Sequence, residues 1–127
     1  MTAYLIVRAE VDPSVREGFD TWYQNEHLPD AVKGFNALSA KRGWSRVEDN
    51  VHIAFYEFPD ADTANRIASS DTIKEFIKEF DRHWEGKVTR SRDVVEFSQK
   101  IKSDFWQIAD ISGPGLGRLP PSLLFGY

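Results

Sequence analysis

The stretch 36–58, NALSAKRGWSRVEDNVHIAFYEF, predicts two strands joined by a short hairpin. Its first part, 36–47, alternates apolar and polar side chains as a half-buried strand does. The polar residues Glu-Asp-Asn at 48–50 then provide a loop, and 51–58 is rich in aromatic and β-branched residues. Consecutive strands with so short a connection pair side by side in an antiparallel sheet.

A strand and a helix are predicted on the N-terminal side of this hairpin. Residues 3–11, AYLIVRAEV, are mostly apolar and indicate a central strand. Asp12 and Pro13 then supply an N-cap acceptor and a first-turn proline, and large side chains follow at helical spacing. Because Pro29 disfavours the α conformation at the residue before it, we expect this helix to end near His27.

A second helical region and a last strand are predicted after the hairpin. Asp60 and Asp62 are candidate N-caps of a short helix that we expect to break near 69–70. A longer helix follows and is expected to end at Gly86, and 89–98, TRSRDVVEFS, predicts a fourth strand. The apolar face of the longer helix consists of Ile73, Phe76, Ile77, Phe80 and Trp84.

The order strand, helix, strand, strand, helix, strand predicts an α+β fold of the ferredoxin-like kind, with a four-stranded antiparallel sheet. We assign residues 1–100 to this domain, since 127 residues leave little room for a second core. The remaining stretch, 101–127, is a C-terminal extension. Its apolar end predicts packing on the domain or on a partner subunit.

Both helices of such a fold cover one face of the sheet, so the other face is open. We expect an apolar patch on that face that is too large for a monomer. Packing two such faces together would bury it, which predicts a two-fold homodimer in the form of a dimeric α/β barrel. The residues expected on the open face are Leu38, Ala40 and Trp44, with some of Tyr4, Ile6, Val95 and Phe97.

Composition excludes several classes of function. The absence of cysteine rules out disulfides, thiolate nucleophiles and cysteine-based metal or iron–sulfur sites. A net charge of −4 gives no electrostatic basis for binding nucleic acid or an anionic membrane. No apolar stretch approaches the roughly 20 residues of a membrane span, and the N-terminus does not resemble a signal peptide, so we expect a cytoplasmic protein.

Two further features of the composition are the aromatic content and one basic stretch. Aromatic residues make up 13% of the chain, which indicates aromatic packing or a cavity lined by large side chains. One basic stretch is also present, but acidic residues are interleaved with it, so we interpret it as a solvated helix end and strand. Its basic members are Arg82, Lys87, Arg90 and Arg92.

The segment 19–29, FDTWYQNEHLP, with the following Gly34-Phe35 and Arg42, resembles the dimeric α/β barrel superfamily and most of all its EthD-like branch. Members often carry two aromatic residues followed by His-x-Pro at this place. The resemblance covers roughly residues 3–98. It implies the fold predicted above but no single reaction, because the superfamily includes isomerases, cofactor-free monooxygenases, haem enzymes and members without known activity.

His27 is the first candidate for catalysis. In one interpretation the helix end delivers the imidazole to a cavity between helices and sheet. There it would act as a general acid and base with a pKa near neutrality, its protonated form favoured by the helix C-terminus. In the other interpretation His27 caps the helix by bonding its free carbonyl groups. Glu26 is adjacent in sequence, but neighbours on a helix point about 100° apart.

The candidate substrate-binding residues come from the same helix and from the hairpin. Trp22 and Tyr23 precede His27 by about one turn and form either part of the core or an aromatic wall with a hydroxyl donor. Arg42 is suited to hold a carboxylate or oxyanion, or else to pair with Glu57 or Glu96. The further candidates are Trp44, in phase with Arg42, and Tyr56, which shares a strand face with His52; we expect His52 itself at the surface.

These residues support three hypotheses. The first is a cofactor-independent isomerase or monooxygenase that acts on a small hydrophobic or aromatic metabolite through His27. The second is a non-catalytic protein that binds such a molecule without changing it. The third, haem binding, follows only from the resemblance and would show as a Soret band. No pair of histidines has metal-ligand spacing, so we expect neither a metal nor another cofactor.

Overall fold

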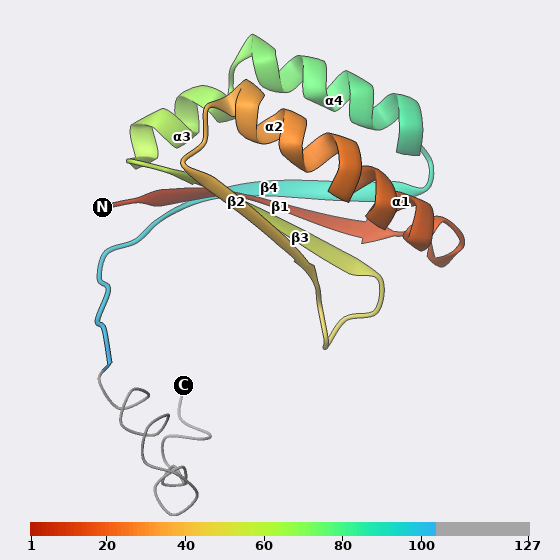
Figure 1. Cartoon of the computed structure of the whole chain (residues 1–127), viewed down its shortest axis with the longest axis horizontal. Coiled ribbons are helices and arrows are strands. Elements are labelled where there is room, and N and C mark those ends of the chain that lie inside the picture. The colour runs from red at the N-terminus through yellow and green to blue at the C-terminus, as the bar shows by residue number, and fades with distance from the viewer. Residues whose placement is uncertain (104–127) are drawn as a thin grey trace, which may run out of the picture.

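The computed structural model describes residues 1–103 and contains one four-stranded sheet (Figure 1). The strands are β1 (Ala3–Val11), β2 (Ser39–Trp44), β3 (Val51–Phe58) and β4 (Val88–Glu96). Their order is β2-β3-β1-β4, and every neighbouring pair is antiparallel. This is the predicted ferredoxin-like arrangement, with β1 in the interior of the sheet and β2 and β4 at its edges.

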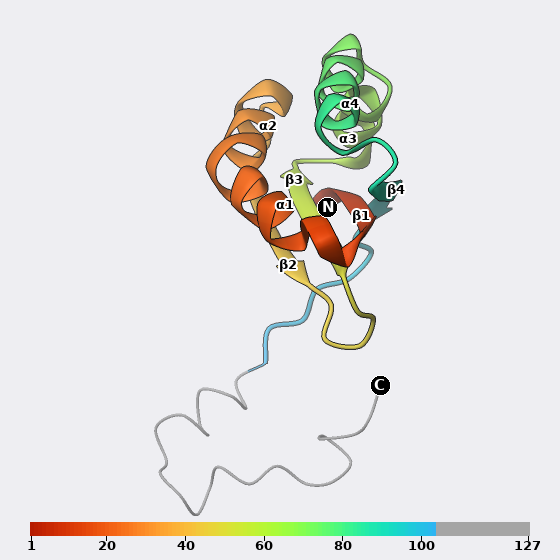
Figure 2. The same cartoon turned by 90° about the vertical axis from the view of Figure 1, so that its right-hand side faces the viewer.

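All helices lie on one face of the sheet and leave the other face open (Figures 1 and 2). A 3₁₀ turn (Pro13–Val15) leads into α1 (Arg16–Trp22), and the same helical rod continues to Phe35. The second group consists of α3 (Ala61–Ala68) and α4 (Asp71–Trp84). Between these two helices Ser70 accepts a hydrogen bond from the Ile73 N–H and so begins α4, which confirms the expected break near 69–70.

The helix does not end at His27, and that prediction is wrong. A π-helical turn (Tyr23–His27) follows α1 and joins it to α2 (Leu28–Phe35). The Leu28 N–H donates to the carbonyl of Tyr23, five residues earlier. Pro29 therefore falls in the first turn of a new α-helical segment, where its missing N–H costs little. The rod ends instead at Asn36, which adopts a left-handed conformation with φ of 53°.

Strand β2 is shorter than the expected 36–47, and the side chains expected on its open face point toward the helices instead. Ala40 lies opposite Tyr56 and Trp44 opposite His52, and all four side chains are on the helix side of the sheet. Trp44 donates to Asp20 of α1, which fixes this orientation. The predicted exposure of Ala40 and Trp44 on the open face is therefore wrong, because both side chains lie on the helix side, where Trp44 packs against Phe19 of α1.

The expectation for the open face holds for Tyr4, Ile6, Val95 and Phe97: Val95 lies opposite Tyr4, whose ring contacts that of Phe97. Leu38 is 61% exposed just before β2, and its place on this face stays a prediction. Residues 101–103 form no helix or strand, and 104–127 lie outside the described residues. The packing expected of the 101–127 extension therefore stays a prediction.

Candidate functional site

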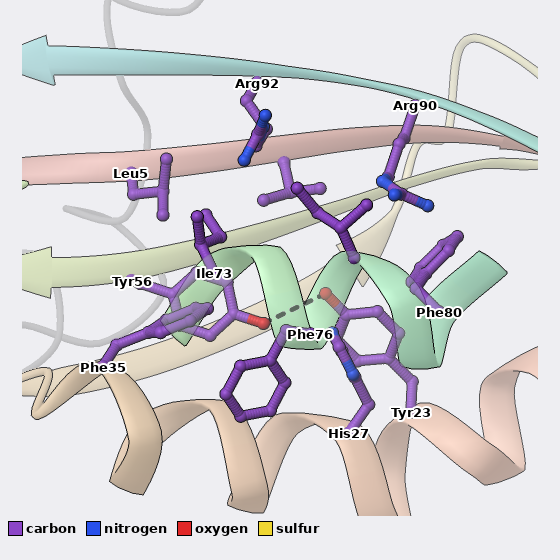
Figure 3. A pocket seen from close by; sticks show the side chains of 12 residues that line it. Leu5, Tyr23, His27, Phe35, Tyr56, Ile73, Phe76, Phe80, Arg90 and Arg92 are labelled. Carbon is purple, nitrogen blue, oxygen red and sulfur yellow. Dashed lines mark hydrogen bonds between the residues drawn. The ribbon is translucent and has the colours of Figure 1, made fainter. Parts of the chain in front are cut away.

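A cavity lies between the sheet and the two groups of helices (Figure 3). The π-helical turn contributes Tyr23 and His27 to its wall, and β3 contributes Tyr56. Arg90 and Arg92 project toward it from β4, opposite these three side chains (Figure 3). The rest of the wall is apolar and consists of Leu5, Val7, Phe35, Ile73, Phe76, Ile77 and Phe80.

The cavity is nearly filled by its own walls. Its volume is about 40 Å³, room for a few water molecules. Ligand sites commonly begin at about 300 Å³, so a metabolite would enter only if a wall moved. Phe76 and Ile77 of α4 are the candidates for such movement, because both are only half-buried. Beyond Arg90 and Arg92 a broader open groove of about 600 Å³ runs along β4.

His27 is held by aromatic rings and leaves both ring nitrogens without a hydrogen bond inside the part of the chain that the structure describes. It is 9% exposed and stacks on Trp22 with ring centroids 4.6 Å apart. The ring of Tyr23 meets it edge-on at 4.7 Å. Burial, reinforced by the positive charges of Arg90 and His83, lowers the pKa of His27 to about 4.

This geometry changes the expectations for His27. The predicted near-neutral pKa is wrong, because burial outweighs any effect of a helix end, and the helix continues past this residue. The capping interpretation fails for the same reason, since the carbonyl of Tyr23 already accepts from the Leu28 N–H. Glu26 is exposed and lies outside the cavity wall. At neutral pH His27 is thus an uncharged imidazole facing the cavity.

A pair of tyrosine hydroxyls lies beside His27. The hydroxyls of Tyr23 and Tyr56 are 3.1 Å apart and share a hydrogen bond. Burial raises the pKa of Tyr23 to about 12 and that of Tyr56 well above its ordinary value, so both groups stay protonated. Two hydroxyls carry two protons, and their mutual bond uses one. The second proton is available to an oxygen atom placed in the cavity.

Three of the predicted binding residues do not reach the cavity. Trp22 lies behind His27 and supports its ring. Arg42 pairs with Asp20 at 2.8 Å, and the Trp44 indole N–H donates to the same carboxylate oxygen at 2.8 Å. The alternative pairing of Arg42 with Glu57 or Glu96 is also wrong. The structure thus places His27, Tyr23 and Tyr56 together in the cavity wall and leaves the other three outside it.

His52 is buried, in contrast to its predicted place at the surface. It is 1% exposed, and its Nε2 lies 3.3 Å from a guanidinium nitrogen of Arg42. Burial and this positive charge lower its pKa to about 4. Its ring also contacts the rings of Phe19 and Tyr23, with centroids 5.2 and 4.5 Å apart. Its position one residue into β3 gave no sequence signal of this burial.

Sequence reasoning missed Arg90 and Arg92 as wall residues. The signal was present in the alternation of β4, because Arg90 and Arg92 share a face with Val94. In β4 this face turns toward the helices: Arg92 lies opposite Val7 and Arg90 opposite Ala9. Of the basic stretch that was predicted to be solvated, Arg82 and Lys87 are exposed, whereas Arg90 and Arg92 line the cavity.

The described residues offer little to a metal or a large cofactor. Residues 1–103 contain no group of three or more potential metal ligands. The cavity of about 40 Å³ in this conformation does not fit a porphyrin beside His27. No helix in this part of the chain is long and apolar enough to cross a membrane.

No protein-family model matches the chain, and no curated protein matches it by sequence. Its structure is similar to that of an EthD family protein from Bacillus halodurans, with a TM-score of 0.59 and 20% identity over 76% of this chain and 99% of the other. It is also similar to a variant of SnoaB, a cofactor-independent oxygenase from Streptomyces nogalater, with a TM-score of 0.57 and 12% identity over 80% and 98%. The chain has the fold of these proteins.

A third solved structure, an antibiotic biosynthesis monooxygenase, has a TM-score of 0.50 and 10% identity over 76% of this chain and 99% of the other. The resemblance carried by segment 19–29 is therefore confirmed at the level of fold. At these identities the likeness extends to the fold alone.

Proposed function

We propose that the chain is a small cofactor-independent enzyme, an isomerase or monooxygenase, that removes a proton from a hydrophobic or aromatic metabolite in the cavity. One observation carries the proposal: an uncharged His27 with unbonded ring nitrogens lies beside a hydroxyl pair that has a proton to donate. Isomerisation and cofactor-free oxygenation of a carbonyl compound both begin by removing a proton from carbon.

The residues would divide this step between them. A ring nitrogen of His27 takes the proton from the carbon next to a carbonyl group, and the electron pair moves onto the carbonyl oxygen. The spare hydroxyl proton of the Tyr23–Tyr56 pair donates a hydrogen bond to that oxygen as its charge develops. Negative charge in the cavity also favours the imidazolium form and so raises the low pKa of His27 during the reaction.

Hydrogen–deuterium exchange at carbon tests this step before the natural substrate is known. The probe is 2-tetralone, an aromatic ketone with acidic α-protons, incubated with the full chain in D₂O without oxygen and followed by proton NMR. We expect the chain to accelerate the loss of the α-proton signals and His27→Gln to reduce the enzymatic part at least a hundredfold, the usual size of a general-base effect.

His83→Gln is the matched control, since His83 is an exposed histidine that does not line the cavity. Tyr23→Phe removes one hydroxyl of the pair and should slow the exchange without abolishing it. Equal exchange by wild type and His27→Gln would overturn the proposal.

A second candidate is a non-catalytic protein that binds the same kind of molecule. The observation in its favour is that no carboxylate in residues 1–103 bonds to His27, as the orienting group of a catalytic histidine commonly does. A ligand that purifies with the chain and is released chemically unchanged, together with no exchange in the tetralone assay, would establish this alternative.

We also propose that two copies pair through the open faces of their sheets. Tyr4 lies at the centre of an apolar cluster there, with ring centroids 5.4 Å from Phe97 and 6.2 Å from Phe55. Light scattering should give twice the mass of the chain, and Phe55→Asp should give one chain mass. Gln24→Asp, an exposed change on the helical side, should stay dimeric. A monomeric wild type would contradict this assembly.

A further inference from the structure

Arg92 is a charged group that the proposed proton transfer does not use. It lies on the cavity side of β4, and among residues 1–103 its guanidinium has no ion pair and no hydrogen bond. The other arginines nearby are all paired. Arg90 bonds to Asp81 at 2.9 Å and stacks over the Phe80 ring at 4.1 Å, and Arg82 pairs with Glu79.

The charges around Arg92 do not balance its positive charge. The cavity wall contains no carboxylate, and Asp81, which lies outside it, pairs with Arg90, so Arg92 is the wall charge without an ion pair among residues 1–103. Arg92 also borders the open groove along β4, where Asp93 is the acidic neighbour but forms no ion pair with it within the described chain. The chain as a whole has a net charge of −4, so this local excess of positive charge is not part of a general basic surface.

The cavity and the groove meet at the two arginines. Leu5, Arg90 and Arg92 line both of them. An apolar ring lying between the helices and the sheet would therefore hold any polar substituent at the junction, within reach of a planar guanidinium that matches a carboxylate. The groove is open beside the arginines, whereas the cavity takes a ring only when a wall such as Phe76 and Ile77 moves.

We propose that the site selects apolar or aromatic molecules that carry an anionic group, and that Arg92 binds this group with support from Arg90. The inference rests on the proposed function for the location of the site, and it adds the class of ligand. Arg92 is the arginine left to bind the anionic group, because Arg90 already bonds to Asp81 and stacks over the ring of Phe80.

Two probes of nearly the same shape, 2-naphthoate and 2-naphthamide, separate charge from size. Binding of each to the full chain is measured by titration calorimetry and by chemical shift changes at neutral pH. We expect naphthoate to bind about tenfold more tightly than naphthamide. This factor is at the lower end of what a charge-assisted hydrogen bond contributes to affinity, because Arg92 is exposed to solvent. Arg92→Gln should remove this preference and leave the affinity for naphthamide within twofold.

Two further variants make the test specific. Arg92→Lys keeps the charge and should retain part of the preference, and Arg46→Gln, an exposed change in the hairpin loop, should retain all of it. Equal binding of the two probes by wild type, or equal loss of both in Arg92→Gln, would overturn the inference. The tetralone assay uses an uncharged probe, so its result bears on the proton transfer by His27 and the tyrosine pair and not on Arg92, and the two proposals fail separately.

Discussion

Acidification should destabilise this fold well above the pH at which carboxylates are protonated, because two buried histidines must take up charge. His27 and His52 have a pKa of about 4 in the folded chain against an ordinary value of 6.5. Between these values the unfolded chain binds protons that the folded chain does not, so the free energy of unfolding falls as the pH is lowered from 6.5 to 4. Above pH 6.5 neither histidine contributes to a pH dependence.

The size of the effect follows from the two shifts. Each difference of about 2.5 pH units corresponds to about 3.4 kcal/mol, so the two histidines together account for about 7 kcal/mol, comparable to the whole stability of a small domain. The ion pair of Asp20 with Arg42 acts in a lower range. It holds the pKa of Asp20 below its usual value of 3.8, so its contribution is lost only below that pH.

Urea unfolding followed by tryptophan fluorescence at pH 7, 6, 5 and 4.5 measures this dependence. We expect His27→Gln to lose about half of the pH dependence, while His83→Gln retains most of it, because His83 is the smallest of the causes that lower the pKa of His27. A wild-type free energy of unfolding that stays constant between pH 7 and pH 4.5 would refute the reasoning. It would mean that water or a local opening solvates both imidazoles in the folded state.

Three substitutions test the packing around the site. Asp20→Asn removes the charge that holds Arg42 and should lower the free energy of unfolding by about 1–3 kcal/mol in a urea titration; an unchanged midpoint would contradict this. Gly34→Ala places a Cβ 2.6 Å from the Phe76 ring and should push that ring into the cavity, so naphthoate affinity should fall in calorimetry while stability changes by only about 1 kcal/mol. Tyr23→Phe leaves one hydroxyl without its partner and should cost about 1 kcal/mol in the same urea titration, with no loss as the opposing result.

The sequence predicted the sheet and the second group of helices closely, because their signals are local. Strands 3–11 and 51–58 have the predicted bounds, and the caps before α3 and α4 bind as their residue types suggest. The first helix was mispredicted because the rule for the residue before proline assumes an ordinary α-helix. A π-helical turn shifts the register ahead of Pro29, and nothing in the local pattern shows such a turn.

The candidate site was predicted in part for a different reason. The resemblance of segment 19–29 pointed to His27 and helical or strand spacing to Tyr23 and Tyr56, but the alternation did not show which face of β2 meets the helices. A shift of one residue exchanges the two faces of a strand, and that decided the place of Arg42. Arg92 was missed although the alternation of β4 places it on the helix side. The pairing of Arg42 with Asp20 joins residues that are 22 positions apart and depends on tertiary packing.

The pH profile of carbon-proton exchange tests the central claim most directly, because it asks whether His27 acts as an uncharged base. The measured quantity is the exchange rate of 2-tetralone with the wild-type chain, minus the rate with His27→Gln, between pH 4 and pH 8. The account predicts a difference that is constant from pH 6 to 8 and falls only as the pH approaches the value of about 4 given by burial. A difference of zero, or one that falls with a midpoint near 6.5, would contradict it.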